Sequence, residues 1–441
     1  MLFSLFENVL DSYTSRSRQI VLAFSGGIDS RVLLDLLSNY RDTHSNHRYL
    51  VIHVDHGLSK ESDQWMQQCE ELVQDIGFPF KGVNVSVERY GNSIEEVARD
   101  ARYKALLDNT EVNALIVTGQ HADDQAETFL LALKRGSGPA GLSAMPLIRP
   151  LGHAELLRPL LSVTRKEIER YAYDERLSWI DDESNLDCRF DRNFIRHSWL
   201  PSAQTRWPGL TKSINRSAVL CAEQEQLLEE LLSEHYSKVM LESNVLSLSA
   251  LNGCSKSIQV ALVRRWLKQT SNISVSKAQL QEVFSSVITA SSDANPKLQL
   301  GSWKVVRFQK CLYVIPDCQD ITEWHSRLEM GTSLQLPDGV GELCLMFGGK
   351  SRWSLRTPME NEPVWVRFNP EGISANPIGR QGKRKLKKLY QEYGIPSWSR
   401  RRTPLVFYGE HLAAVAELFV CKGYEGQECD LVWYKHHVLS A

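Results

Sequence analysis

The amino-acid sequence predicts an α/β protein that begins with a parallel, Rossmann-like sheet and continues into a helical domain and a β-rich α+β domain. Over the first 135 residues, strand patterns alternate with helix patterns. Such alternation requires right-handed crossovers and gives a parallel sheet covered by helices on both faces. A glycine-rich turn at residues 25–30 joins the first strand to its helix. Ligands of these sheets bind at the carboxyl ends of the strands, so we expect the functional site at that edge.

The predicted elements of the first domain follow one another in a regular order. Residues 20–24 form a short apolar run, typical of a strand buried on both faces, and residues 32–37 repeat apolar side chains at helical spacing. Further strands are expected at residues 49–54, 80–87 and 114–118, and helices at residues 63–76, 94–107 and from Asp123 or Asp124. Residues 136–145 are rich in glycine and lack periodicity, so we expect a mobile surface loop beside the site.

The whole chain is predicted to contain three domains. Residues 1–208 form the first domain, and residues 209–315 form a mostly helical linker and middle domain, with helices expected near residues 210–232, 258–267 and 278–287. Strand patterns return beyond Leu298, so residues 316–441 are predicted to form a β-rich C-terminal domain. A length of 441 residues is compatible with this number of domains.

Composition argues for a cytoplasmic globular protein. The hydrophobic fraction of 42% is ordinary, and nine cysteines occur without a CxxC pair, as in reduced proteins. The first 13 residues carry two acids and no basic leader, so we expect an amphipathic helix there and no signal peptide. No window approaches the roughly 18 apolar residues of a membrane span, so we expect no membrane partner.

The basic residues gather in one segment although the formal net charge is only −2. Residues 380–402 contain nine lysines and arginines and a single acid, Glu392, with Tyr390, Tyr393 and Trp398 interleaved. A charge run is most often a solvated face. The alternative is contact with nucleic-acid phosphates.

The turn at residues 25–30 has the features of a phosphate-binding loop. Its members are Ser25, Gly26, Gly27, Ile28, Asp29 and Ser30. Glycines let a ligand approach the backbone closely, and free N–H groups at a helix start attract phosphate. The GxxxxGK[ST] spacing of the P-loop ATPases is absent; the carboxylate of Asp29 instead implies a divalent ion such as Mg²⁺ or a positive partner. The alternative is an ordinary turn with an Asp–Ser helix cap.

A second group of candidate residues follows the predicted strand at 114–118. His121, Asp123, Asp124 and Glu127 cluster at a strand end and helix start, and residues 124 and 127 share a helix face. Such acids can bind Mg²⁺ on a triphosphate or accept a proton from a nucleophile. The alternative is that they only complement the helix dipole.

Two arginine-containing segments remain ambiguous on composition alone. Residues 178–201 combine acids, amides and arginines, among them Arg192 and Arg196, and a salt-bridged loop would look similar. Arg99 and Arg102 lie three apart on one helix face, where they can meet phosphate or pair with Glu95 and Asp100. The exposed-pair interpretation is slightly favoured for the second segment.

Five segments, taken in order, resemble one family. They read SGGIDS from Ser25, HVDHGL from His53, EEVARDARY from Glu95, HADDQAET from His121 and WIDDESNLDCRFDRNFIR from Trp179. The first alone resembles the SGGxDS loop of the N-type ATP pyrophosphatases, which break the bond between the α and β phosphates of ATP. Together with RSAVLCAEQEQLLEELL, GRQGKRKLKKLYQEYGIPSW and RRRTPLVFYGEHLAAVA, the set resembles the long form of the bacterial tRNA(Ile)-lysidine synthetases. The resemblance covers nearly the whole chain, and is weakest over residues 270–295 and 317–361.

The resemblance implies conversion of the wobble cytidine in an isoleucine tRNA with a CAU anticodon into lysidine. In that family ATP adenylates the carbon-2 oxygen of the base with release of pyrophosphate, and the ε-amine of free L-lysine then displaces AMP. A lysine amine has a pKa near 10.4, so the site must remove a proton before attack. The first domain would then be an ATP pyrophosphatase domain in a cytoplasmic ligase.

The same resemblance assigns the loop of residues 25–30 to ATP. We further expect Asp29 and Asp124 to position Mg²⁺ or the amine, and His121 to hold the triphosphate, which makes these three the predicted catalytic residues. Arg192 or Arg196 is expected to contact RNA or nucleotide. Further contacts with tRNA phosphates are expected from Lys383, Arg384 and Lys385. The sequence leaves the oligomeric state open, with a homodimer as one option.

Two other functions compete with this interpretation. A tRNA thiolase of the same fold would share the loop, but such enzymes commonly rely on paired cysteines or an iron–sulfur cluster, and the sequence has no CxxC. A nucleotide- or RNA-binding module without catalysis is the second alternative. The acids Asp123, Asp124 and Glu127 argue against it, because simple phosphate binding gains nothing from added negative charge.

Overall fold

The computed structural model describes residues 1–57, 62–85, 94–180, 189–242, 244–271, 273, 275–291 and 294–435. It divides into two compact units, Met1–Glu230 and Leu231–Ala441. The division falls inside one long helix, α10 (Leu210–Val239), which begins where the linker helix was predicted. No helix in the described ranges is long and apolar enough to span a membrane.

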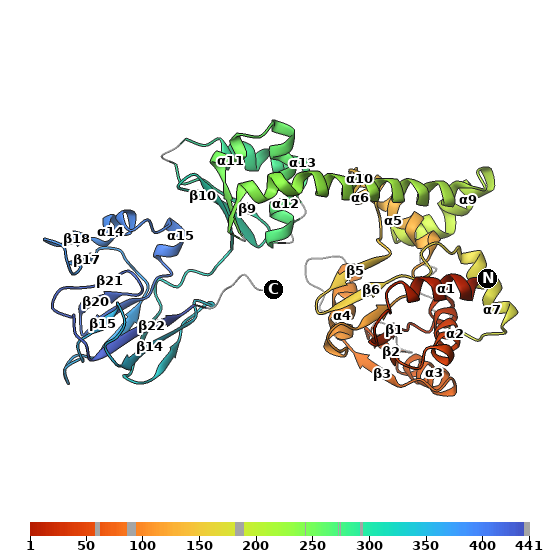
Figure 1. The fold of residues 1–441 in the computed structure, drawn as a ribbon, viewed down its shortest axis with the longest axis horizontal. Helices are drawn as coiled ribbons and strands as arrows, with labels where there is room; N and C mark the ends of the chain where they lie inside the picture. The colour runs from red at the N-terminus through yellow and green to blue at the C-terminus, as the bar shows by residue number, and fades with distance from the viewer. Residues whose placement is uncertain are drawn as a thin grey trace. The chain divides into compact units, whose positions relative to one another are not determined.

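The first unit is built on a six-stranded sheet with the order β3-β2-β1-β4-β6-β5 (Figure 1). Its strands are β1 (Gln19–Ala23), β2 (Arg48–Asp55), β3 (Phe80–Asn84), β4 (Leu115–Val117), β5 (Ile148–Leu151) and β6 (Ala154–Leu157). The pairs β1–β2, β2–β3, β1–β4 and β4–β6 are parallel, and β5 is an antiparallel edge strand. The predicted parallel sheet is confirmed.

The helices of the first unit cover both faces of this sheet. They are α1 (Leu2–Asp11), α2 (Ile28–Thr43), α3 (Ser62–Asp75), α4 (Ile94–Asp108), α5 (Ala122–Lys134), α6 (Pro139–Leu142), α7 (Arg165–Asp174), α8 (Asp191–Phe194), the π-helix η2 (Ile195–Trp199) and α9 (Leu200–Arg206). The turn α6 lies within residues 136–145, which were expected to be loop throughout. Pro139 occupies the first turn of α6, where its missing N–H costs nothing.

Strand β1 shows how the sequence divides the two faces. Ile20 and Leu22 pack into an apolar core with residues of α1, α2, α3 and α7, whereas Val21 packs into a separate core with Leu106 of α4. Successive side chains of a strand point to opposite faces, so a continuous apolar run is needed here. Helix α4 therefore lies on the face opposite to α2 and α7.

The second unit contains a small α+β domain followed by the C-terminal domain. The strands β7 (Met240–Glu242), β8 (Val245–Ser247), β9 (Lys297–Leu300), β10 (Trp303–Phe308) and β11 (Cys311–Pro316) form an antiparallel sheet in the order β7-β8-β11-β10-β9. It packs with α11 (Leu248–Asn252), α12 (Lys256–Ser271), α13 (Lys277–Glu282) and the π-helix η3 (Val283–Ile288). The predicted helices are present, but the strand patterns that begin at Leu298 belong to this domain's own sheet.

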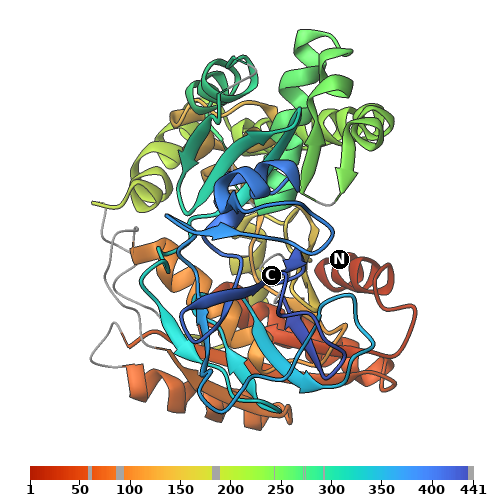
Figure 2. The same cartoon turned by 90° about the vertical axis from the view of Figure 1, so that its left-hand side faces the viewer.

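The C-terminal domain consists of two larger antiparallel sheets that share one apolar core. One has the order β12-β16-β19-β20-β21 and the other β13-β14-β22-β15. These strands are β12 (His325–Arg327), β13 (Ser333–Gln335), β14 (Glu342–Phe347), β15 (Ser354–Leu355), β16 (Val364–Arg367), β19 (Leu405–Tyr408), β20 (His411–Val415), β21 (Phe419–Val420) and β22 (Cys429–Tyr434). Strands β14 and β22 pair along six residues although they are far apart in sequence (Figures 1 and 2).

The basic segment of the sequence forms a small layer on this domain. A short hairpin of β17 (Ser374–Ala375) and β18 (Arg384–Lys385) leads into α14 (Leu386–Glu392) and α15 (Ser397–Arg400). Leu386 and Leu389 pack into an apolar cluster with residues of β19 to β21. The segment is thus part of the fold and not a tail, and the C-terminal domain is β-rich as predicted.

Candidate active site

The loop after β1 is shaped by its glycines. Gly26 has a φ of +84°, and a Cβ built on it would lie 2.9 Å from Cys69 Sγ and 3.0 Å from Ile180 Cδ1. The carbonyl of Gly26 accepts a hydrogen bond of 3.0 Å from the N–H of Ile180. Only glycine combines this backbone conformation with this lack of space.

Helix α2 begins at this loop without a side-chain cap. Its N-cap residue is Gly27, with φ −70° and ψ 164°, and the helix has no side-chain cap within the described residues. Ser30 Oγ instead donates to the Gly27 carbonyl (2.8 Å) and lies 3.1 Å from Ser25 Oγ. The alternative of an Asp–Ser cap is therefore wrong. The N–H groups at the start of α2 are available to an anion.

The loop after β4 lies directly against the glycine loop. A Cβ on Gly119 would come within 3.2 Å of the Asp29 carbonyl carbon and 3.3 Å of Ser30 N. This close approach follows from the sheet order, because β1 and β4 are parallel neighbours whose carboxyl ends meet at one edge. It places His121 and the start of α5 beside Asp29.

His121 joins the two predicted catalytic carboxylates. It is 3% exposed and its Nε2 lies 3.6 Å from Asp29 Oδ1 and 3.4 Å from Asp124 Oδ2. Its Nδ1 accepts a hydrogen bond from Asp123 N (3.2 Å), while the Asp124 carboxylate accepts one from His121 N (3.1 Å). This reciprocal capping box fixes the ring at the start of α5. Since Nδ1 is an acceptor, neutral His121 carries its proton on Nε2, toward the carboxylates.

Arginines neutralise these carboxylates. Arg165 Nη1 donates to both oxygens of Asp29 at 2.8 and 2.7 Å, and its backbone N–H donates to Asp123 Oδ2 at 2.7 Å. Arg192 and Arg196 both donate to Asp124 Oδ1, at 3.2 and 2.7 Å. Each also donates to the buried carboxylate of Glu127, at 2.8 and 2.7 Å. The site is therefore a network of carboxylates and guanidinium groups around one histidine.

The two predicted catalytic carboxylates titrate differently. Burial raises the pKa of Asp29, and the positive charges of His121, when its ring is protonated, and of Arg165 oppose this only in part. Burial also acts to raise the pKa of Asp124, but His121, Arg192 and Arg196 outweigh it, and the pKa of Asp124 is lowered. Asp29 is thus the better proton acceptor of the pair.

The structure brings together most of the residues that the sequence singled out in the first unit. Asp29, His121, Asp124, Arg192 and Arg196 form one contact network. Asp181, Asp182, Asn185 and Asp187, which belong to the segment of residues 178–201 that the sequence singled out, lie outside the described residues. Arg192 and Arg196 contact acids, and the expectation that one contacts RNA or nucleotide stays a prediction.

Sequence reasoning missed Arg165. A signal was present, because Thr164 and Glu167 form the capping pattern that marks a helix start, and that helix follows a strand of the parallel sheet. Arg102 also differs from expectation. Its guanidinium donates to His56 Nε2 at 3.2 and 3.0 Å, whereas the predicted partner Glu95 has no described side chain.

The carboxylates of the site bear on whether it can hold a metal ion. Within the described ranges, no group of three or more histidine, cysteine, aspartate or glutamate side chains has the geometry of a metal site. Asp29 and Asp124 supply carboxylate oxygens, which suit Mg²⁺, but both are engaged by guanidinium groups. These residues fit a Mg²⁺ ion that takes its remaining ligands from substrate phosphates and water, which is its usual mode of binding to nucleotides.

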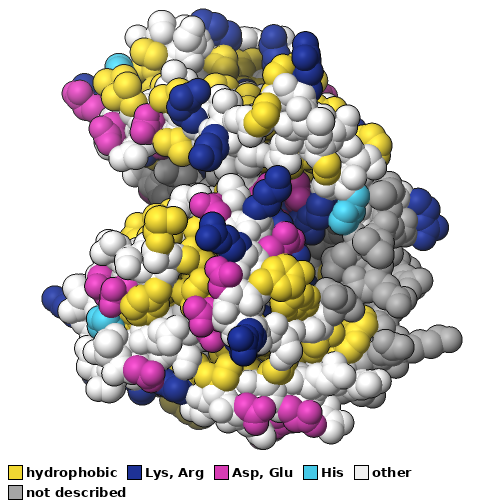
Figure 3. Space-filling model, turned by 90° about the vertical axis from the view of Figure 1, so that its right-hand side faces the viewer, with side chains coloured by type: hydrophobic (Ala, Val, Ile, Leu, Met, Phe, Trp, Pro, Cys, Tyr) yellow, Lys and Arg dark blue, Asp and Glu magenta, His cyan; other side chains and the backbone are white. Residues whose placement is uncertain are grey.

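The basic segment of the second unit is only partly free. Arg380 and Arg384 both pair with Glu392, and the fold brings further acids to Arg401 and Arg402, namely Glu371 and Asp338. The exposed lysines of the segment are Lys383, Lys385, Lys387 and Lys388. These four lysines carry the local positive charge. On the face that Figure 3 shows, by contrast, acidic and basic side chains are mixed.

Only one of the three aromatic residues of that segment is exposed, contrary to the prediction that they are interleaved with the bases on its surface. Tyr390 is 1% exposed and belongs to the apolar cluster beneath α14, so it is not available to RNA. Trp398 packs against Tyr313, with ring centroids 5.2 Å apart. Tyr393 alone of the three is exposed.

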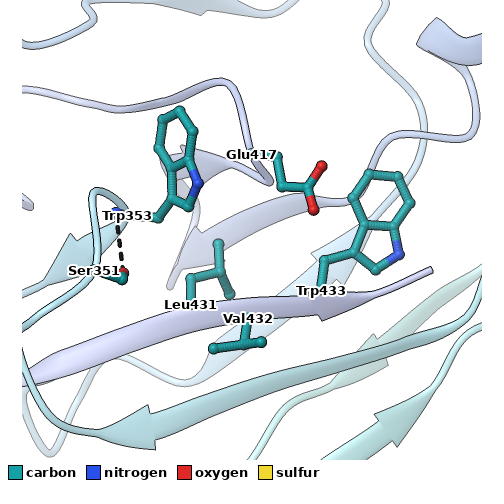
Figure 4. A pocket seen from close by; sticks show the side chains of 6 residues that line it. All are labelled: Ser351, Trp353, Glu417, Leu431, Val432 and Trp433. Atoms are coloured by element: carbon teal, nitrogen blue, oxygen red, sulfur yellow. Dashed lines mark hydrogen bonds between the residues drawn. The ribbon is translucent and has the colours of Figure 1, made fainter.

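A hollow of about 390 Å³ lies on the second sheet of the C-terminal domain. Trp353 and Trp433 stand on either side of Leu431, with Glu417 above the sheet between them (Figure 4). Lys435 pairs with Glu417 and places its Nζ 4.5 Å from the Trp433 ring centroid. Lys435, a cation of the chain itself, therefore already contacts both the acid and one aromatic ring of this hollow.

Comparison with known proteins connects this geometry to a family. The chain matches the PP-loop domain over residues 3–203, the TilS substrate binding domain over residues 246–313 and the TilS substrate C-terminal domain over residues 364–436. It is 45% identical over 435 residues to the tRNA(Ile)-lysidine synthase of Vibrio vulnificus strain YJ016, covering 98% of this chain and 99% of the relative. The chain belongs to the tRNA(Ile)-lysidine synthase family. The tRNA(Ile)-lysidine synthase of Vibrio cholerae El Tor Inaba N16961 is also 45% identical, over 421 residues and 95% of each chain.

Membership of the tRNA(Ile)-lysidine synthase family makes the chain a ligase of tRNA modification that uses ATP. Its RNA substrate is tRNA(Ile). Among solved structures, the U34-tRNA thiolase NcsA from Methanococcus maripaludis, which holds a [4Fe-4S] cluster, matches with a TM-score of 0.42 and 17% identity over 52% of this chain and 79% of that one. A likeness this weak supports no argument about function.

Proposed function

We propose that the chain ligates free L-lysine to carbon-2 of the wobble cytidine in the CAU anticodon of tRNA(Ile), giving lysidine. The observation that carries this proposal is the uncapped glycine loop beside His121, Asp29 and Asp124. A phosphate cradle next to carboxylates suits a reaction that cleaves ATP and then uses an amine nucleophile. A simple phosphate-binding site would gain nothing from the acids.

The first step is adenylation of the base. The carbon-2 oxygen of cytidine attacks the α-phosphate of ATP, a new P–O bond forms, and the bond to the β-phosphate breaks with release of pyrophosphate. The loop of residues 25–30 binds the phosphates through the N–H groups at the start of α2, and the Nε2–H of His121 donates to them. When bound, Mg²⁺ neutralises phosphate charge, and Asp29 and Asp124 are the residues that would hold it.

The second step is attack of the lysine ε-amine on carbon-2. A C–N bond forms, the C–O bond to the adenylate breaks, and AMP leaves. The amine must lose a proton, and Asp29 is our candidate acceptor because burial raises its pKa. Asp124 and Glu127 offer negative charge to an ammonium group when Arg192 and Arg196 release them.

The test is incorporation of labelled lysine. Protein is incubated with ATP, Mg²⁺, labelled L-lysine and an unmodified tRNA(Ile) transcript, with a methionine tRNA of the same anticodon as control. We expect label in the first RNA and none in the second. Asp29→Asn should abolish lysine-dependent pyrophosphate release; unchanged release would show that Asp29 is not required.

We also propose that the exposed bases around α14 contact tRNA phosphates. The triple variant Lys383→Ala, Arg384→Ala and Lys385→Ala should weaken tRNA binding and flatten its salt dependence, since removal of one phosphate contact lowers the slope of log K against log salt by about 1. A control variant replaces Lys81, Lys238 and Lys350, three exposed lysines that lie outside residues 246–313 and 364–436. Equal affinities for the two triple variants would rule the contact out.

A further inference from the structure

A cluster of arginines surrounds one tyrosine on the α4 face of the first unit. Helix α4 supplies Arg99, Arg102 and Tyr103, strand β5 supplies Arg149, and Arg158 follows directly after β6. The guanidinium carbon of Arg149 lies 4.9 Å from the Tyr103 ring centroid. Burial acts to raise the pKa of Tyr103, but the interactions with Arg149, Arg158 and Arg99 outweigh it, and the pKa of Tyr103 is lowered. We call these four arginines and Tyr103 the arginine cluster.

The cluster lacks the carboxylates that neutralise the other arginines of this unit. Arg165, Arg192 and Arg196 each hold one or more carboxylates in an ion pair. Among the residues whose side chains the structure describes, none of the four arginines in the cluster has such a partner. The charges that act on Arg102 and Arg158 are those of neighbouring arginines and of Tyr103. Within the part of the chain that the structure describes, the cluster therefore concentrates positive charge without a carboxylate partner.

Donors without acceptors lie in and beside the cluster. Arg158 is 4% exposed; its Nη1 donates to the Pro146 carbonyl at 2.8 Å, but its Nε has no partner in the described residues. His56 Nε2 accepts from Arg102, so neutral His56 carries its proton on Nδ1, and that buried atom also has no described partner. Burial and Arg102 lower the pKa of His56 to about 4, which keeps the ring neutral. Buried donors of this kind require an acceptor.

The position of the cluster separates it from the triphosphate. The glycine loop turns into α2, which packs on one face of the sheet, whereas α4 packs on the other. Both lie at the carboxyl edge, because Arg158 and His56 follow the last residues of β6 and β2. An anion bound at the arginine cluster would thus lie near the reacting phosphates of ATP, but it would be a separate group.

The exposure of the cluster indicates the size of its ligand. Arg158 is buried at its base, Arg149 is half-buried, and Arg99 and Arg102 are exposed on the outer side of α4. A basic surface that rises from a buried donor to an open rim suits a long polyanion better than one small carboxylate. A nucleic-acid backbone is a long polyanion of this kind. Arginine is a good partner for its phosphates because the planar guanidinium group presents its N–H donors as a fork.

We propose that the arginine cluster binds a backbone phosphodiester of the RNA substrate next to the nucleotide that is modified. This inference rests on the proposed function, because it takes tRNA as the ligand of the same edge of the sheet. The cluster positions the anticodon backbone while the glycine loop positions ATP. Sequence-independent contacts of this kind fix the register of the RNA and leave base recognition to other groups.

The test compares tRNA binding by matched arginine variants of the full-length protein. The double variant Arg99→Gln and Arg149→Gln should lower the slope of log K against log salt by about 0.7 to 1 for each phosphate that the protein no longer neutralises, and raise the KM for tRNA about 10-fold. The control for each substitution is Arg170→Gln, which removes the same single charge from an exposed arginine of α7. Arg149→Lys should keep the salt slope, because it keeps the charge.

The possible outcomes separate this inference from the proposed function. Wild-type lysine incorporation tests the function, and the salt slope of the variants tests the cluster. A double variant with the slope and tRNA affinity of Arg170→Gln would overturn the proposal. So would a raised KM for ATP or lysine with an unchanged KM for tRNA. If the double variant is unstable by circular dichroism, the exposed single variant Arg99→Gln decides by the same slope.

Discussion

The two glycines of the loop predict opposite effects of the same substitution. Gly26→Ala places a Cβ at φ +84°, 2.9 Å from Cys69 Sγ and 3.0 Å from Ile180 Cδ1. A left-handed backbone costs an L-residue about 1–2 kcal/mol, and overpacking costs about 1–3 kcal/mol. The expected loss in the free energy of unfolding is therefore about 3 kcal/mol. For a unit of this size the melting temperature should fall by about 10 °C.

Gly27→Ala is the matched control. Its φ of −70° is open to alanine, and the nearest atom to the added Cβ is Ser25 Oγ at 3.7 Å. The reduced entropy of the unfolded chain should leave its melting temperature unchanged or raise it by up to about 3 °C. The added methyl group should nevertheless weaken ATP binding, because it lies on the backbone that approaches the phosphates.

The assay is thermal unfolding of the full-length variants by calorimetry, together with ATP binding by isothermal titration. We expect a large loss of stability for Gly26→Ala alone, because only its added Cβ meets a positive φ and close neighbours. Equal melting temperatures for the two variants would refute it, because the difference depends only on the two backbone conformations and their neighbours. Unimpaired ATP binding by Gly27→Ala would refute the role of the loop.

Three further predictions concern buried and paired groups. Glu127→Gln removes the charge that holds Arg192 and Arg196, and should lower the free energy of unfolding by about 1–3 kcal/mol in urea titrations; an unchanged midpoint would contradict the network. Because the pKa of His56 in the folded state is about 4, the unfolded state binds more protons between pH 6.5 and 4, so stability should fall as pH falls through this window. His56→Gln should flatten that slope, and parallel curves would contradict the assignment. Hydrogen bonds from Arg356 hold the pKa of Glu362 at about 2, so its contribution is full above pH 4.5 and disappears as pH falls toward 2; Glu362→Gln and wild type should differ at pH 7 and converge near pH 2.

The parallel sheet could be predicted because its signals are local. The apolar runs and the alternation of strands and helices identify the strands and the edge at which the loop of residues 25–30 and His121 meet. The middle sheet could not be predicted in the same way. Strands β7 and β8 have three residues each, and β8 pairs with β11, which comes more than 60 residues later in the chain. Segments this short carry no clear periodicity.

The ion pairs of the site show a second limit. Arg165 and Asp29 are 136 positions apart, and no pattern along the chain indicates that they meet. The burial of Tyr390 is a different case, because the helical spacing of Leu386, Leu389 and Tyr390 does indicate one apolar face. The lysines between these residues mask that spacing, because they make charge the dominant feature of the segment.

Arg165 ties together the starts of three helices. It is the first residue of α7, its backbone N–H donates to Asp123 in the first turn of α5, and its side chain holds Asp29 in the first turn of α2. A ligand that draws the Asp29 carboxylate away from Arg165 therefore breaks the side-chain half of this link and leaves the backbone hydrogen bond to Asp123 in place. The glycine loop is thus connected to α7 through the Arg165 side chain, and α7 to α5 through the Arg165 backbone, so that one residue joins the three helix starts.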